Sequence, residues 1–171
     1  MNNLHTKQAG YTLIELLMYV VIISVLLTSI TYFFGITIDA RAKNQSIAEV
    51  NDQGAAVMDT MTQTIRNASS ITAPAAGASA NSLTLVVPTG SLSPTVFNLN
   101  STTLQIKEGA ASAVAMTSSD VQVTSLTFKN LTRSGTPGLV QVSFTLSRTN
   151  PSNRNEYDYQ KTFTSSAEVA W

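Results

Sequence analysis

The stretch GYTLIELLMYVVIISVLLTSITYFFGITIDARAK, residues 10–43, decides the fold of this chain. Residues 16–38 within it are 23 consecutive residues without a charge, rich in Leu, Ile, Val, Phe and Tyr. Folded as a helix with a rise of ~1.5 Å per residue, this run is about 34 Å long, enough to cross a hydrocarbon core of ~30 Å. Charges return at Asp39 and end the run sharply. The pattern predicts a single transmembrane helix.

Two other interpretations of this segment stay open. A secretory signal peptide has an apolar region of roughly 7–15 residues, which is shorter than this one, although Ala40-Arg41-Ala42 offers a small-x-small cleavage site. A generic signal anchor gains little from the positive-inside rule, because Lys7 precedes the run while Arg41 and Lys43 follow it. Neither interpretation accounts for Glu15.

Glu15 is the one acidic residue inside the apolar run from Tyr11 to Ile38. An acidic side chain at mid-membrane depth costs on the order of 2.5–3.5 kcal/mol by insertion scales. A helix that serves only as an anchor has no use for such a residue. Either Glu15 marks the membrane interface, where its carboxylate reaches water, or it has a specific role in the apolar environment.

The segment Gly10-Tyr11-Thr12-Leu13-Ile14-Glu15-Leu16-Leu17 resembles the prepilin processing motif of type IV pilins and type II secretion pseudopilins. The resemblance is strong over residues 8 to about 40, weaker to about 70, and only architectural beyond. It implies that a prepilin peptidase cuts between Gly10 and Tyr11 and that the same enzyme N-methylates Tyr11. Phenylalanine is the more usual residue after the cut, so Tyr11 is an aromatic departure from the pattern.

The resemblance also implies a role for Glu15 in fibre assembly, where it pairs with the Tyr11 ammonium of the next subunit. The implied partners are prepilin peptidase, other pilin or pseudopilin subunits, an inner-membrane assembly platform and membrane lipid. The implied location is a single-pass cytoplasmic (inner) membrane protein with an extracytoplasmic head, which becomes part of a pilus or pseudopilus fibre.

A second helical pattern continues beyond the membrane segment. Residues 39–68 contain no proline, and apolar or small residues recur at steps of three and four, which is typical of an amphipathic helix with one face in a core. This face comprises Ile47, Val50, Gly54, Val57 with Met58, Met61, Ile65 and Ala68. We expect one bent or continuous helix from Tyr11 to about Ser69. Gly54 weakens this helix by about 1 kcal/mol relative to alanine, and a close helix–sheet contact is one reason for a glycine there.

The remaining chain changes to a period of two, which predicts an antiparallel β-sheet head and an α+β fold. The predicted strands are residues 83–87, 96–99, 103–107, 121–123, 126–128 and 140–146, and a last strand that starts at Tyr157 and extends toward Val169. The predicted organisation is a leader peptide (1–10), a transmembrane assembly helix (11–38), its amphipathic continuation (39–70), a flexible linker (71–82) and the head (83–171).

The composition excludes several function classes. Ten basic and ten acidic side chains give a formal net charge of zero, so the chain has no electrostatic reason to bind nucleic acid. It has no cysteine, and its only histidine is His5, which excludes thiolate metal sites and His-based catalysis in the head. We therefore predict no enzyme activity, cofactor or metal.

The predicted function is that of a structural subunit, a minor pilin or pseudopilin of a type IV pilus or type II secretion-like fibre. The order of a long helix, an Ala-rich crossover and strands resembles the minor subunits of these systems. The rival from another class is a membrane-anchored adhesin or binding module with a β-rich extracytoplasmic head, and a membrane-tethered enzyme is a weaker rival.

The first prediction concerns the mature terminus. Because Gly10 precedes an aromatic residue, a glutamate at 15 and an uncharged helix, we expect the mature chain to begin at N-methyl-Tyr11. Mass spectrometry of the protein from native membranes measures this terminus. An intact Met1 terminus in cells with an active prepilin peptidase, or a terminus near Arg41, contradicts the prediction.

Overall fold

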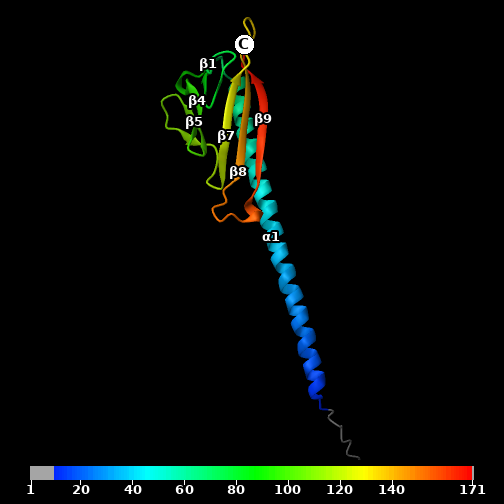
Figure 1. Ribbon diagram of the computed structural model, residues 1–171. Helices are drawn as coiled ribbons and strands as arrows, with labels where there is room; N and C mark the ends of the chain where they lie inside the picture. The colour runs from blue at the N-terminus through cyan, green and yellow to red at the C-terminus, as the bar shows by residue number, and fades with distance from the viewer. Residues whose placement is uncertain (1–9, 171) are drawn as a thin grey trace, which may run out of the picture. The chain divides into compact units, whose positions relative to one another are not determined.

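The computed structural model describes residues 10–170 (Figure 1). Residues 1–9, which hold most of the predicted leader with His5 and Lys7, and Trp171 lie outside the described residues. The chain divides into two compact units, residues 1–41 and 42–171.

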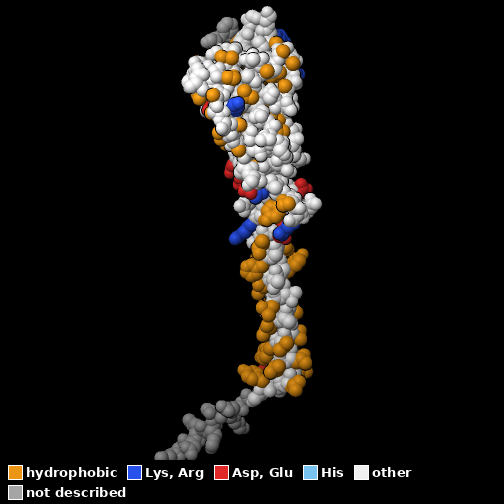
Figure 2. Space-filling model, turned by 90° about the vertical axis from the view of Figure 1, so that its left-hand side faces the viewer, with side chains coloured by type: hydrophobic (Ala, Val, Ile, Leu, Met, Phe, Trp, Pro, Cys, Tyr) orange, Lys and Arg blue, Asp and Glu red, His pale blue; other side chains and the backbone are white. Residues whose placement is uncertain are grey.

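The predicted long helix is confirmed as α1, Leu13–Arg66, a single helix of 54 residues. It begins after Thr12 and ends just before Asn67, slightly inside both predicted limits. In the first unit its apolar side chains are exposed, and Figure 2 shows them along the surface of this segment. Among the described residues α1 is the one helix long and apolar enough to cross a membrane.

In the second unit α1 buries one face. The buried residues of the helix are Ser46, Val50, Gly54, Val57, Met61, Thr62 and Ile65, so the predicted apolar stripe is largely confirmed. Two of these buried residues are polar, and the hydroxyl of each donates a hydrogen bond within the helix. Ser46 donates to the carbonyl of Ala42 and Thr62 to that of Met58, both over 2.9 Å. Burying these hydroxyls therefore leaves no unsatisfied donor.

The head consists of two antiparallel sheets. The five-stranded sheet has the order β1-β3-β4-β5-β6, and the four-stranded sheet has the order β2-β7-β8-β9. The strands are β1 (Ser70–Ala73), β2 (Ser79–Ala80), β3 (Leu83–Val86), β4 (Thr95–Asn100), β5 (Thr103–Glu108), β6 (Val114–Ala115), β7 (Val121–Asn130), β8 (Leu139–Arg148) and β9 (Gln160–Glu168). Two short 3-10 turns, η1 (Gly90–Leu92) and η2 (Asn155–Tyr157), complete it.

The core of the head lies between the sheets and the second half of α1. Phe97 on β4 and Phe128 on β7 are fully buried, with ring centroids 6.4 Å apart, so they join the two sheets. In β8 alternate residues point inward, and Val140, Val142, Phe144 and Leu146 are all fully buried. Figure 1 shows the second half of α1 running along the β7-β8-β9 sheet.

At Gly54 this half of α1 lies in close contact with the sheet. A Cβ atom at this position would lie 2.1–2.6 Å from ring carbons of Phe163 on β9. No real Cβ contact is that short, so only glycine lets the ring lie against the helix backbone. The expected helix–sheet contact at Gly54 is therefore confirmed.

The structure corrects three expectations for the head. First, residues 71–82 are not a plain flexible linker, because this segment contains most of β1 and all of β2, which form edges of different sheets. Second, residues 121–123 and 126–128 belong to one strand, β7, whose pairing with β8 is interrupted by a register shift between Val123 and Ser125. Third, Tyr157 does not begin a strand.

The third correction has a visible cause. Residues 155–157 form the 3-10 turn η2, and β9 starts only at Gln160. The ammonium of Lys43 on α1 donates hydrogen bonds to the carbonyl oxygens of Asn155 and Asp158, over 3.2 and 2.5 Å. These two carbonyls are turned toward the helix and are not used in a strand ladder.

The Gly54 contact generates the second prediction. In an exposed helix, Gly→Ala gains about 1 kcal/mol of helix propensity. Here we expect Gly54→Ala to destabilise the head by about 1–2 kcal/mol, because overpacking a core costs typically 1–3 kcal/mol. Thermal unfolding of a fragment of residues 42–171, the second compact unit, measures the effect as a Tm lower by several degrees.

Gly90→Ala is the matched control, because nothing lies within 4 Å of a Cβ at that position. Shrinking the facing ring with Phe163→Leu should make Gly54→Ala less costly. A Gly54→Ala fragment as stable as the wild-type fragment would contradict the contact.

Candidate functional site

The start of α1 carries the residues singled out from the sequence. Gly10, Tyr11 and Thr12 precede the helix, which begins at Leu13. A side chain at Gly10 would meet nothing within 4 Å, and Tyr11 is 78% exposed. The peptide bond between Gly10 and Tyr11 thus lies in accessible, non-helical chain, the form in which a protease can reach a backbone.

Thr12 caps the helix. Its hydroxyl oxygen accepts a hydrogen bond from the backbone N–H of Glu15 over 3.3 Å. This is one half of a Thr-x-x-Glu capping box, which satisfies a backbone donor left free at a helix start. The acidic residue also lies in the first turn of α1, where its charge complements the positive end of the helix dipole.

The Glu15 carboxylate has no cation within reach on its own helix. The next basic residue along α1 is Arg41, which is 26 residues further and so about 39 Å away along the axis. Oε1 of Glu15 instead accepts a hydrogen bond from the Tyr19 hydroxyl over 3.1 Å. Glu15 is half-buried, whereas the other residues from Gly10 to Ile36 are exposed.

The rest of this segment is suited to an apolar environment. Its serine and threonine hydroxyl groups donate to backbone carbonyls three or four residues earlier, over 2.8–3.0 Å; they belong to Ser24, Thr28, Ser29, Thr31 and Thr37. Such local hydrogen bonds hide polar groups that would be costly in lipid. Glu15 is therefore the one residue of the run whose charge needs a partner from outside the helix.

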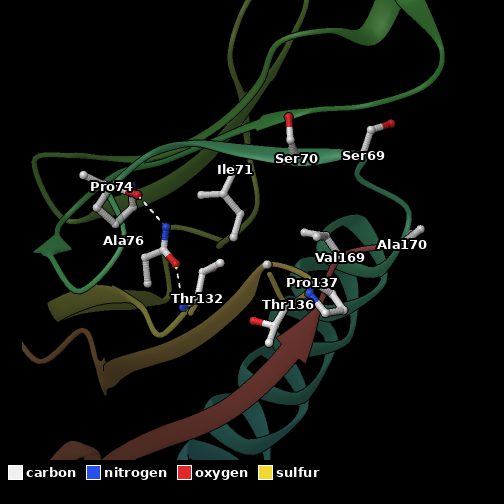
Figure 3. A pocket seen from close by; sticks show the side chains of 13 residues that line it. Ser69, Ser70, Ile71, Pro74, Ala76, Thr132, Thr136, Pro137, Val169 and Ala170 are labelled. Carbon is white, nitrogen blue, oxygen red and sulfur yellow. Dashed lines mark hydrogen bonds between the residues drawn. The ribbon is translucent and has the colours of Figure 1, made fainter. Parts of the chain in front are cut away.

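The head contains one further candidate, a cavity of about 470 Å³ beside β1 and the β7–β8 loop. Buried Asn130 forms part of its wall: its amide donates to the carbonyl of Pro74 over 2.8 Å and its oxygen accepts from the N–H of Thr132 over 3.0 Å. Figure 3 shows these two hydrogen bonds, with Ile71, Pro137 and Val169 as apolar walls. The amide of Asn130 is thus engaged in holding the wall in place.

Two residues near the start of α1, Thr12 and Tyr19, were not singled out from the sequence. Thr12 shows a signal that would have found it, the Thr-x-x-Glu spacing to Glu15. Tyr19 shows another, because it stands four residues after the only acid of the apolar run, on the same side of a helix.

A long apolar helix with a capped acidic first turn, joined to an antiparallel β head, is a pilin-like architecture. Residues 5–31 match the family model described as the prokaryotic N-terminal methylation motif. The match confirms the predicted resemblance and supports a type IV pilin-like protein with prepilin cleavage and N-methylation. No curated protein and no solved structure matches the chain.

The motif implies processing by prepilin peptidase and assembly with other pilin subunits. Together with the apolar helix, it fits a membrane-anchored pilin. The pilin-like family and fold are those of structural proteins.

The third prediction concerns the accessible Gly10. Because the peptidase has to approach this backbone closely, we expect Gly10→Leu to leave the precursor inserted in the membrane but uncut. Immunoblots of membrane fractions measure the ratio of precursor to mature chain. Gly35→Ala is the control, since it also fills open space around a glycine of the same segment. Normal maturation of Gly10→Leu would contradict the assignment.

Proposed function

We propose that the chain is a minor pilin or pseudopilin, a structural subunit of a type IV pilus or type II secretion-like fibre. The observation that carries this proposal is Glu15, a carboxylate in an exposed apolar run with no cation within reach on its own helix. The methylation motif that encloses it supports the same conclusion.

In the proposed maturation, prepilin peptidase hydrolyses the bond between Gly10 and Tyr11. Water supplies the hydroxyl of the new Gly10 carboxylate, and the Tyr11 nitrogen leaves as an amine that takes up a proton. In its neutral form this amine then attacks the methyl group of a sulfonium methyl donor bound by the same enzyme. The donor leaves as a thioether, and the terminus becomes an N-methylammonium. Residues 1–10 are released as the leader, and the helix from Tyr11 onward stays in the cytoplasmic membrane on an assembly platform.

In the proposed fibre, Glu15 of one subunit pairs with the Tyr11 ammonium of the next. The apolar helices of neighbouring subunits exclude water, so a buried carboxylate has to find a positive partner. Because the ammonium is a single group at the chain end, the pair also sets the axial register, as a lone polar residue does in a coiled coil. Apolar packing along residues 13–38 supplies most of the cohesion.

A membrane-anchored adhesin or binding module is the second candidate function, and the 470 Å³ cavity of the head favours it. Its volume is in the range of small-molecule sites. This candidate predicts a ligand for the head and no dependence on cleavage at Gly10. Within the first candidate, abundance separates the subunit types: a major pilin dominates sheared fibres, whereas a minor one is scarce there and needed for initiation.

The fourth prediction concerns Glu15→Ala. If Glu15 marks only an interface, the change is harmless or improves membrane retention, since it removes a costly charge. If Glu15 pairs with a neighbour, the change leaves an ammonium unpaired, which costs roughly 3–5 kcal/mol in a buried pair. We therefore expect insertion and cleavage to survive while incorporation into fibres falls sharply.

The measurement is the amount of chain in sheared fibres relative to that in membranes. Asp52→Ala is the control, because it removes an exposed acid from the same helix. An unchanged ratio for Glu15→Ala removes the assembly role. A subunit at the fibre tip has no neighbour above it, so for that position crosslinks between cysteines placed near residues 11 and 15 of adjoining subunits replace the ratio as the readout.

A further inference from the structure

Tyr19 contacts both Glu15 and Tyr11 of its own chain. Its hydroxyl donates to Oε1 of Glu15 over 3.1 Å. Its ring lies beside that of Tyr11, with centroids 6.5 Å apart and planes at 78°, an edge-to-face contact. One side chain therefore contacts the carboxylate and the residue that becomes the chain terminus after cleavage.

In an apolar environment, Tyr19 and Glu15 each provide the other with a hydrogen-bond partner. A phenol hydroxyl without a partner is costly there, and so is a carboxylate. The other tyrosine within this part of the helix, Tyr32, has Thr28 and not an acid four residues before it. Tyr19 is thus the tyrosine of this segment that stands over an acid one turn earlier.

The hydrogen bond also restricts the Glu15 side chain. A glutamate has three rotatable side-chain torsions, and ordering them on docking weakens association. With Oε1 tied to Tyr19, this ordering is done before a neighbour arrives. A carboxylate accepts several hydrogen bonds on its two oxygens, so the other oxygen stays available to the donors of an ammonium.

We propose that Tyr19 is a positioning residue for fibre assembly, which holds the Glu15 carboxylate aimed at the amino terminus of the neighbouring subunit. This inference rests on the pairing of Glu15 with Tyr11 proposed above. The hydroxyl performs this role, and the ring packs against Tyr11 in addition.

The test compares full-length chains with Tyr19→Phe and Tyr32→Phe, each of which loses one hydroxyl from the same apolar segment. Mass spectrometry with isotope-labelled peptides measures the chain in sheared fibres relative to cleaved, methylated chain in membranes. This ratio removes any effect on insertion or processing. We expect Tyr19→Phe to lower this ratio about tenfold, which corresponds to the lower end of the range for a hydrogen bond to a charged group. We expect Tyr32→Phe to leave the ratio unchanged.

A double-mutant cycle identifies the partner of the hydroxyl. If Tyr19 acts through Glu15, Tyr19→Phe has no further effect when added to Glu15→Ala. The fibre incorporation of Glu15→Ala can be as low as the background measured with Gly10→Leu. In that case Glu15→Asp replaces Glu15→Ala in the cycle, because aspartate keeps the charge but its shorter side chain draws the carboxylate away from the Tyr19 hydroxyl. In that background we expect Tyr19→Phe to cost much less than tenfold.

Three results would overturn the inference. Wild-type incorporation of Tyr19→Phe beside a defective Glu15→Ala shows that the pairing stands without help from Tyr19. An equal loss from Tyr19→Phe in both backgrounds shows that the hydroxyl acts elsewhere. Normal incorporation of Glu15→Ala overturns the pairing itself, and the role of Tyr19 with it.

Discussion

One uninterrupted helix has to be stable in two different surroundings, and the rest of the structure depends on this constraint. The backbone of α1 satisfies its own hydrogen bonds over 54 residues, which is the condition for a chain to lie in lipid. Before Asp39 the side chains add almost no polar demand, because hydroxyls such as that of Thr28 bond back to the helix. After Asp39 the same helix carries charges on one face and buries the other.

The last strand, β9, makes close contacts with the second half of α1. Phe163 on β9 lies on the backbone at Gly54 and stacks on Phe144 with ring centroids 5.4 Å apart. Next to it, the ammonium of Lys161 donates to the side-chain oxygen of Asn51 over 2.6 Å. The contacts at Gly54 and Asn51 join positions about 110 residues apart, so forming them carries the loop-closure cost of non-local contacts.

Patterns within one element were sufficient to predict much of this fold. The uncharged run, the three-and-four spacing of Val50, Val57 and Met61, and the alternation in residues 140–146 each report on one helix or strand. Residues 96–99 and 103–107 were also predicted as strands, and they form the β4–β5 hairpin, whose turn lies at Ser101 and Thr102.

Features that depend on distant partners were not predictable in this way. The two-residue strand β2 exists only because β7 pairs with it, and its sequence alone resembles a small-residue linker. The split into two sheets depends on side chains such as Phe97 and Phe128 that meet across the core. The turn η2 lies where the Lys43 ammonium donates hydrogen bonds to the backbone carbonyl oxygens of Asn155 and Asp158.

The motif at the start of α1 was recognisable because its chemistry is local, and the same locality explains how assembly depends on cleavage. In the precursor the Tyr11 nitrogen is a peptide amide and has no charge to offer to Glu15. Hydrolysis at Gly10 turns it into an amine whose protonated form is a cation. In the proposed fibre this single step removes the leader and creates the only charge that complements Glu15 within the apolar segment. An uncut subunit brings no ammonium, so the Glu15 of its neighbour stays unpaired among the packed helices, which is strongly unfavourable. The electrostatics of the pair therefore select processed subunits without a separate recognition element.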